Sequence, residues 1–136
     1  MGQVGASFNG NIFSYDQPLI IAMNRQSAVL GGVRLRYQSG GYLSGTVLAR
    51  NSIDGLYEAY DSGGSSGTDT AAAILYEGHT EADFDGTAAT SSTVATGIFG
   101  GCAVYKDKMI GYDSSVLTDL NARLIVVNYD VELMSF

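Results

Sequence analysis

The chain has 136 residues, which fits a single domain, and 46% of them are hydrophobic while only 15% are charged. Its formal net charge of −7 argues against binding to nucleic acid or to an anionic membrane surface, because both require Lys and Arg side chains. The lone Cys102 excludes an intramolecular disulfide, and the single histidine leaves too few ligands for a Cys/His zinc site. No segment approaches the roughly 20 apolar residues of a membrane span, and the N-terminus lacks a signal-peptide pattern, so we expect a protein that is not exported through a membrane.

The composition also indicates the fold class. Eighteen glycines and nine tyrosines against a single proline predict a mainly β chain with many tight turns. The charged fraction is low for the surface of a small free monomer, which predicts that a partner covers part of it.

The N-terminal segment, residues 1–14, carries no charge and spaces single apolar residues among Gly, Asn and Ser. This is not the composition of a highly charged disordered tail. Two interpretations stay open: an extended arm that orders against a partner, or a first strand with a frayed end. We expect an arm over residues 1–18 and one β-rich domain over residues 19–136. The apolar anchors of the arm would be Val4, Phe8, Ile12, Phe13 and Tyr15.

The first strands follow this segment. Residues 18–23 form a short apolar run, and residues 33–37 alternate apolar and basic side chains as a half-exposed strand does. The two basic residues, Arg34 and Arg36, have two interpretations. They either read phosphate or form the solvated face of an edge strand, and the edge strand is favoured in an acidic protein.

A pair of strands around a polar loop forms the middle of the chain. Residues 45–48 alternate as a half-buried strand, and Asp54-Gly55 is a strong hairpin signal. Residues 61–67 contain too many glycines for a regular element and lack the Lys-Ser/Thr ending of a phosphate loop. Residues 71–76 carry no charge and begin with small residues, which predicts a strand that is buried on both faces or packed close to another backbone.

The last third begins with a polar loop over residues 78–92. A strand follows over residues 94–99, and Gly100-Gly101 should break it or form a bulge before residues 102–105 continue it. The last strand should span residues 123–133.

One short helix is expected in this third, over residues 115–121. Ser114 would cap it, with Val116, Leu117 and Leu120 on its buried side.

The candidate chemical groups favour structural explanations. Residues 81–86 imitate the start of a calcium loop, but the twelfth position is Ser92 instead of a bidentate carboxylate, so a solvated acidic loop is expected. His79 is the one possible base for a nucleophile, and no nucleophile motif accompanies it. Cys102 lies in an apolar run as a small buried residue would. We therefore expect no catalytic residue, no metal site, no cofactor and no enzymatic activity.

Two segments resemble a known family. Residues 43–49, Leu-Ser-Gly-Thr-Val-Leu-Ala, and residues 71–75, Ala-Ala-Ala-Ile-Leu, are similar to the paired strands of the phage lambda-type head decoration (capsid cement) proteins. The resemblance spans about residues 42–127, and the sequence departs from it at Ala73, where the family usually has glycine. The framework residues that carry it are Gly45, Thr46, Val47, Leu48, Ala71, Ala73, Ile74 and Leu75.

The resemblance implies a small β-tulip or β-barrel-like domain with an extended N-terminal arm. It implies homotrimers at three-fold positions on the outside of an expanded icosahedral head. The partner would be the major capsid protein of an HK97-type shell, and the protein would stabilise the head against internal DNA pressure. The expected location is the outer surface of the virion head, after assembly in the host cytoplasm. No catalytic residues are implied.

Two other functions stay open at this point. One is a tail or fibre β-domain that binds a host glycan, and the other is a small β-barrel binding module or enzyme that would use His79.

Overall fold

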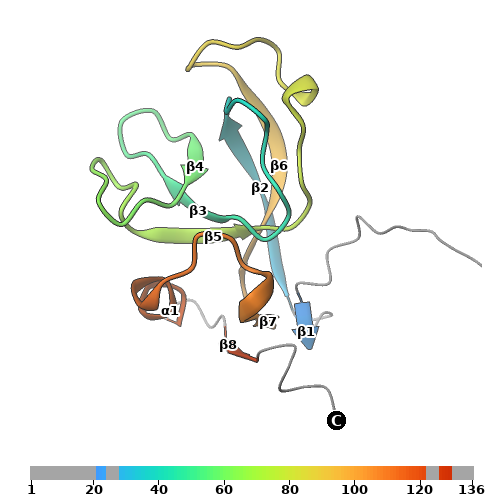
Figure 1. Cartoon of the computed structure of the whole chain (residues 1–136), viewed down its shortest axis with the longest axis vertical. Helices are drawn as coiled ribbons and strands as arrows, with labels where there is room; N and C mark the ends of the chain where they lie inside the picture. Colours follow the sequence, from blue (N-terminus) through green and yellow to red (C-terminus); the bar gives the residue numbers. More distant parts are fainter. Residues whose placement is uncertain (1–20, 24–27, 122–125, 130–136) are drawn as a thin grey trace, which may run out of the picture.

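The computed structural model describes residues 21–23, 28–121 and 126–129. In this part of the chain, five strands close into a barrel (Figure 1). The barrel order is β2-β4-β3-β5-β6, from β2 (Val29–Arg36), β3 (Val47–Arg50), β4 (Tyr57–Ala59), β5 (Ala71–Leu75) and β6 (Ser92–Gly100). A smaller sheet of order β1-β7-β8 comes from β1 (Ile21–Met23), β7 (Ala103–Tyr105) and β8 (Val126–Tyr129). The helical elements are α1 (Ser114–Asn121) and the single 3-10 turns η2 (Glu81–Asp83) and η3 (Lys106–Lys108).

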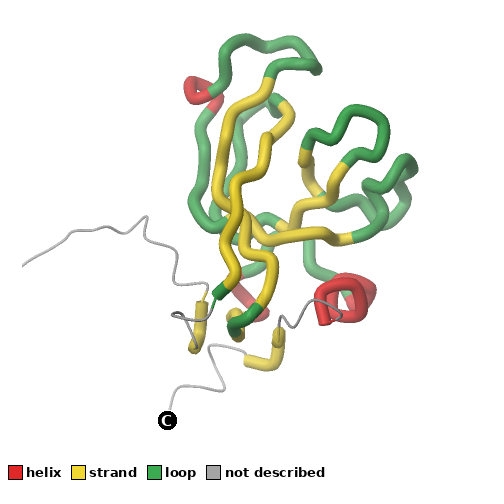
Figure 2. The backbone as a smooth tube through the Cα atoms, turned by 180° about the vertical axis from the view of Figure 1, so that it is seen from behind, coloured by secondary structure: helices red, strands yellow, loops and turns green. Residues whose placement is uncertain are grey.

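The predicted fold class, a mainly β, barrel-like domain with at most one short α-helix, is confirmed for these residues. Helix α1 and the smaller sheet lie at the same end of the barrel, below it in both views (Figure 2). The arm predicted for residues 1–18 lies outside the described residues, as does its boundary with the domain.

The barrel wall has one long ladder and one short seam. Strands β2 and β6 pair antiparallel over eight positions, from Val29 opposite Gly100 to Arg36 opposite Ser92. Strands β3 and β4 form the hairpin predicted at Asp54-Gly55, and β5 lies between β3 and β6. The barrel closes where β4 runs parallel to β2, with Leu35 opposite Tyr57.

This closure corrects the prediction that Arg34 and Arg36 lie on an edge strand. Strand β2 has a hydrogen-bonded neighbour on each side, so it is not an edge. The alternation of its side chains was predicted correctly. Its second neighbour, β4, pairs through Tyr57, which is 22 positions from Leu35 in sequence, and such a distant pairing cannot be predicted from the alternation of one strand.

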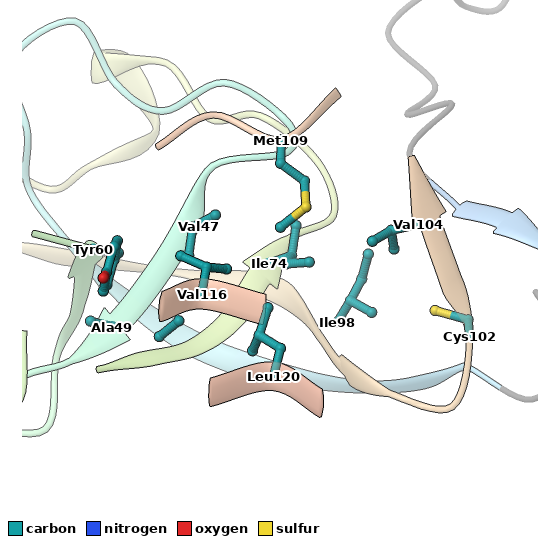
Figure 3. Packing of buried hydrophobic residues seen from close by; sticks show 11 residues of the cluster. Val47, Ala49, Tyr60, Ile74, Ile98, Cys102, Val104, Met109, Val116 and Leu120 are labelled. Atoms are coloured by element: carbon teal, nitrogen blue, oxygen red, sulfur yellow. The ribbon is translucent and has the colours of Figure 1, made fainter. Parts of the chain in front are cut away.

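Two apolar clusters use the two faces of the barrel wall. The interior cluster gathers alternate residues of four barrel strands with loop aromatics: Val33, Leu35, Tyr42, Leu48, Leu75, Phe84 and Ala95. The outer cluster covers the outside of β3, β5 and β6 with α1, β7 and residues 109–112 (Figure 3). In the paired strands β3 and β5, Leu48 and Leu75 therefore face inward, while Val47 and Ile74 face outward. All four are at most 1% exposed, which confirms the prediction that residues 71–75 are buried on both faces.

Strand β2 runs through Gly31-Gly32 and begins at Val29, four residues before the strand predicted over residues 33–37. A side chain at Gly31 would put its Cβ 3.0 Å from the ring atom Cε2 of Phe99. The opposite residue, Gly97, has the same ring atom 3.5 Å from its own Cβ position. The two glycines thus leave room for the Phe99 ring, which packs edge-on against Tyr57 at 6.4 Å between ring centroids.

Helix α1 begins one residue earlier than predicted, and its cap is a different residue. Asp113 Oδ1 accepts hydrogen bonds from the backbone N–H groups of Ser115 and Val116, so Asp113 caps the helix and the assignment to Ser114 is wrong. The buried side was predicted correctly: Val116 and Leu120 are both 0% exposed.

The glycine break after β6 is confirmed. Gly101 has a positive φ of 80°, and the chain leaves the barrel there to form β7 in the smaller sheet. Cys102 is buried in the outer cluster, as predicted. The last predicted strand is observed as β8, Val126–Tyr129, and the rest of that prediction lies outside the described residues.

Candidate binding surface

The two segments that carry the family resemblance lie side by side as β3 and β5. Val47 pairs with Ile74 and Leu48 with Ala73 in an antiparallel ladder. Gly45 precedes the strand, where its positive φ of 91° turns the chain and its N–H donates to Leu75 O at 2.8 Å. The predicted strand start at Gly45 was therefore two residues early.

The remaining framework residues secure this pair from both ends. Thr46 is 7% exposed, and its hydroxyl donates to Leu43 O at 2.6 Å. At the start of β5, the Ala71 N–H donates to Asp119 Oδ2 of α1 at 2.9 Å. Ala73 is fully buried and pairs with Leu48, next to a shift in the β3–β5 register between Leu48 and Ala49. These residues hold the scaffold together and leave no polar group directed at a ligand.

The predicted arm residues lie outside the described residues, so they stay a prediction: Val4, Phe8, Ile12, Phe13 and Tyr15.

The acidic loop after β5 uses its carboxylates within the fold. Glu81 Oε2 accepts the Gly40 N–H at 2.6 Å, and Asp83 Oδ2 accepts the Thr80 N–H at 2.9 Å. His79 Nδ1 lies 3.2 Å from the same Asp83 oxygen, and the His79 backbone pairs with Tyr42. His79 is thus half-buried, with the Asp83 carboxylate beside its ring.

Metal coordination finds no support in the described residues. No group of three or more His, Cys, Asp and Glu side chains among residues 21–23, 28–121 and 126–129 is placed to hold an ion. No helix in the same part of the chain is long and apolar enough to cross a membrane.

The glycine-rich loop before β5 directs its backbone N–H groups inward. The Gly63 N–H donates to Asp61 Oδ1 and the Gly64 N–H to Asp61 O, and the Thr68 N–H donates to Ser65 O. Ser66 O accepts the Ser52 N–H, which ties the loop to the β3–β4 hairpin. These three donors are already used within the loop, so they are not available to an anion.

Arg36 is the most connected charged group of the described residues. Its guanidinium donates to Asp54 Oδ2 at 2.6 Å, to Glu58 Oε2 at 3.0 Å and to Ala89 O at 2.8 Å. It therefore joins β2 to the β3–β4 hairpin and to the loop before β6, across the short parallel seam. A basic residue engaged in this way is not available to a phosphate.

The ionisation of these groups follows from their neighbours. The hydrogen bond from Arg36 to Asp54 raises the pKa of Arg36, and the backbone N–H of Leu56, followed by Arg36, lowers the pKa of Asp54. Burial raises the pKa of Tyr42 to about 12, and the charge of Glu58 adds to this. Burial, then the hydrogen bond to Asp113, raises the pKa of Tyr60. None of these groups is brought toward neutral pH, where a general acid or base works.

What the described surface offers instead is uncovered apolar side chains. Three lie apart from one another in sequence, in loops: Leu43 is 70% exposed, Ile53 82% and Ile110 43%. The other three lie on the paired strands β2 and β6: Val29 is 56% exposed, Leu30 47% and Val94 59%. This second group becomes visible only in the register of β2 against β6, which the alternation of either strand alone does not give.

Compared with known protein families and with curated protein sequences, the chain matches none. The function is therefore inferred from the resemblance of the two framework segments and from this surface.

Proposed function

We propose that this protein is a capsid decoration subunit, a cement protein that binds the outer surface of an expanded icosahedral head as a cyclic trimer. Its partner would be the major capsid protein of an HK97-type shell, and its place the outside of the virion head. The role is structural binding, without a catalytic step, a cofactor or contact with nucleic acid.

The observation that carries the proposal is the pairing of the two family-like segments. Residues 43–49 and 71–75 resemble the family at the residue level, and they form the adjacent strands β3 and β5 with both faces buried. This pairing supports the proposal because the two similar segments form one buried part of the fold. Similarity between separate surface loops would say nothing about a shared fold. The ion pairs of Arg36 with Asp54 and Glu58, and of His79 with Asp83, supply further support, since these groups are engaged within the fold.

The mechanism would be stabilisation by linkage. A protein that binds only the expanded shell lowers the free energy of that state in proportion to its binding free energy. Many copies arranged by the symmetry of the shell add their contributions, and a trimer that contacts several capsomers gains avidity.

The direct test is cosedimentation with purified phage heads. The protein should pellet with empty expanded heads and remain in the supernatant with unexpanded ones. Decorated heads should also resist a higher temperature or a lower ionic strength before rupture. Binding to tails or host cells, with none to expanded heads, would instead favour the tail or fibre glycan-binding domain.

A truncation tests the arm. Deleting residues 1–15 should leave a folded domain with weakened head binding, because an uncharged extended segment with spaced apolar anchors suits strand addition to a sheet edge. A truncated protein that occupies heads as fully as the intact chain would remove the arm from the proposal.

A further inference from the structure

Two aspartates of the chain stand directly before a glycine, Asp54 before Gly55 and Asp85 before Gly86. An aspartate in this position can rearrange without an enzyme. The glycine nitrogen attacks the side-chain carboxyl carbon, and water leaves to close a cyclic succinimide. Water then opens the ring at either carbonyl, which returns aspartate or gives isoaspartate, in which the main chain runs through the former side-chain carboxyl. Glycine favours the reaction because it has no side chain to hinder the attacking nitrogen.

The fold restrains the first of these two pairs. The Asp54 carboxylate accepts the Leu56 N–H at 3.1 Å and the Arg36 guanidinium at 2.6 Å. The Gly55 N–H, whose nitrogen would have to attack, donates to Asn51 O at 2.8 Å. The Leu56 N–H, followed by Arg36, lowers the pKa of Asp54, so the protonated carboxyl, which loses water more readily than the carboxylate, is scarce. Both reacting groups of this pair are therefore held in other contacts.

The second pair has no such restraint. Asp85 is exposed, in the loop between η2 and β6. Among the described residues, neither Asp85 nor Gly86 takes part in a hydrogen bond or an ion pair. A Cβ built at Gly86 would meet only Ser91 Oγ, at 3.2 Å. The carboxyl group and the attacking nitrogen are therefore both free to approach each other.

The loop that contains Asp85 is anchored on either side of it. Phe84 is buried in the interior cluster, where its ring packs edge-on against Tyr37 at 5.6 Å between centroids. Ala89 O accepts Arg36 Nη1 at 2.8 Å. Isoaspartate would add one atom to the main chain between these anchors, in a stretch that is mostly exposed. The added length can extend into solvent, so the reaction alters the loop and leaves the barrel interior in place.

We propose that Asp85 is a site of spontaneous isoaspartate formation in the folded protein, and that the fold protects Asp54 from the same reaction. The modified loop lies at the end of the barrel opposite α1 and the smaller sheet (Figures 1 and 2). This inference goes beyond the proposed function and does not depend on it, because the reaction needs only water and the folded chain.

The test is an incubation of the full-length protein in mildly acidic buffer at physiological temperature. Digestion with trypsin and Glu-C, which cleave after Lys or Arg and after Glu, leaves Asp54 in residues 51–58 and Asp85 in residues 82–106. Isoaspartyl methyltransferase then labels isoaspartate in each peptide, and mass spectrometry identifies the labelled peptide. Isomerisation leaves the mass of a peptide unchanged before labelling, whereas deamidation of Asn51 raises it, so the two reactions can be told apart.

In the native protein, isoaspartate should accumulate in residues 82–106 about tenfold or more faster than in residues 51–58, because the contacts of Asp54 and Gly55 must break first. In denaturing urea those contacts are lost, and the two rates should become similar. The urea arm thus separates protection by the fold from a difference in the local sequence.

The matched variant is Asp85→Glu. It keeps the charge at an exposed side chain without partners, so it should fold like wild type, but glutamate would have to close a larger ring. The label should therefore disappear from residues 82–106. No isoaspartate in residues 82–106 of the native wild type, a label there that persists in Asp85→Glu, or a rate at Asp54 that urea does not raise would each overturn the proposal.

Discussion

Adding one methyl group at Gly31 tests the packing of the barrel interior. The new Cβ would lie 3.0 Å from Phe99 Cε2, closer than ordinary van der Waals contact. Replacing glycine with alanine in a strand gains about 0.4–1 kcal/mol through the unfolded chain. Overpacking a buried site costs about 1–3 kcal/mol. Gly31→Ala should therefore lower the free energy of unfolding by about 1.3 kcal/mol at the midpoints of these two ranges, and by at most about 2.6 kcal/mol.

The neighbouring glycine supplies the control. A Cβ at Gly32 meets nothing closer than 4.0 Å, so Gly32→Ala should leave stability unchanged or raise it by up to about 1 kcal/mol. Urea titrations followed by circular dichroism give both values, with equal m-values expected if the native state stays intact.

A second substitution identifies the cause. Phe99→Leu removes the ring atom that Gly31→Ala would meet, so in that background Gly31→Ala should become neutral or stabilising. The coupling between the two sites should be about 1–2 kcal/mol. If Gly31→Ala is as stable as Gly32→Ala, or if the coupling is absent, the Phe99 ring does not occupy the space that the glycine leaves.

Three further predictions concern the polar groups. Asp113→Ala removes the acceptor of two helix N–H groups and should lower the free energy of unfolding by about 1–2 kcal/mol. Asp113→Ser should recover part of this loss. An alanine variant as stable as wild type would contradict the assignment of Asp113 as the cap. The pKa of Asp54 is lowered from 3.8, so its stabilisation is present above that pH and is lost as the pH falls through the lower folded value. In acid titrations, the stability difference between wild type and Asp54→Asn should shrink toward zero at the acid end. The pKa of Tyr42 is raised from 10.0 to about 12, so wild type should lose stability as the pH rises between these values, and Tyr42→Phe should not show that component.

Local features of the fold could be predicted from the sequence. The Asp54-Gly55 hairpin, the break at Gly100-Gly101 and the buried side of α1 all follow from short-range chemistry: a positive φ at glycine, or apolar residues at helical spacing. The burial of β5 on both faces followed from its lack of charge.

Features that depend on distant neighbours could not be predicted in this way. Whether β2 is an edge strand depends on its pairing with β4. The need for glycine at position 31 depends on the ring of Phe99, which lies 68 positions away in sequence. The helix cap was a different error, because Asp113 is as good a cap as Ser114 and stands directly before it. The exposed apolar side chains of β2 and β6 were visible in the sequence as separate strands. Only the register of β2 against β6 brings them together on one surface.

The parallel seam between β2 and β4 has a consequence for how the barrel opens. It has one register pair, against eight in the β2–β6 ladder, and the Arg36 side chain adds ion pairs to Asp54 and Glu58 across it. The barrel should therefore open there first, as a local unfolding event that separates β4 from β2 while β3 stays paired with β5 and the β2–β6 ladder stays paired.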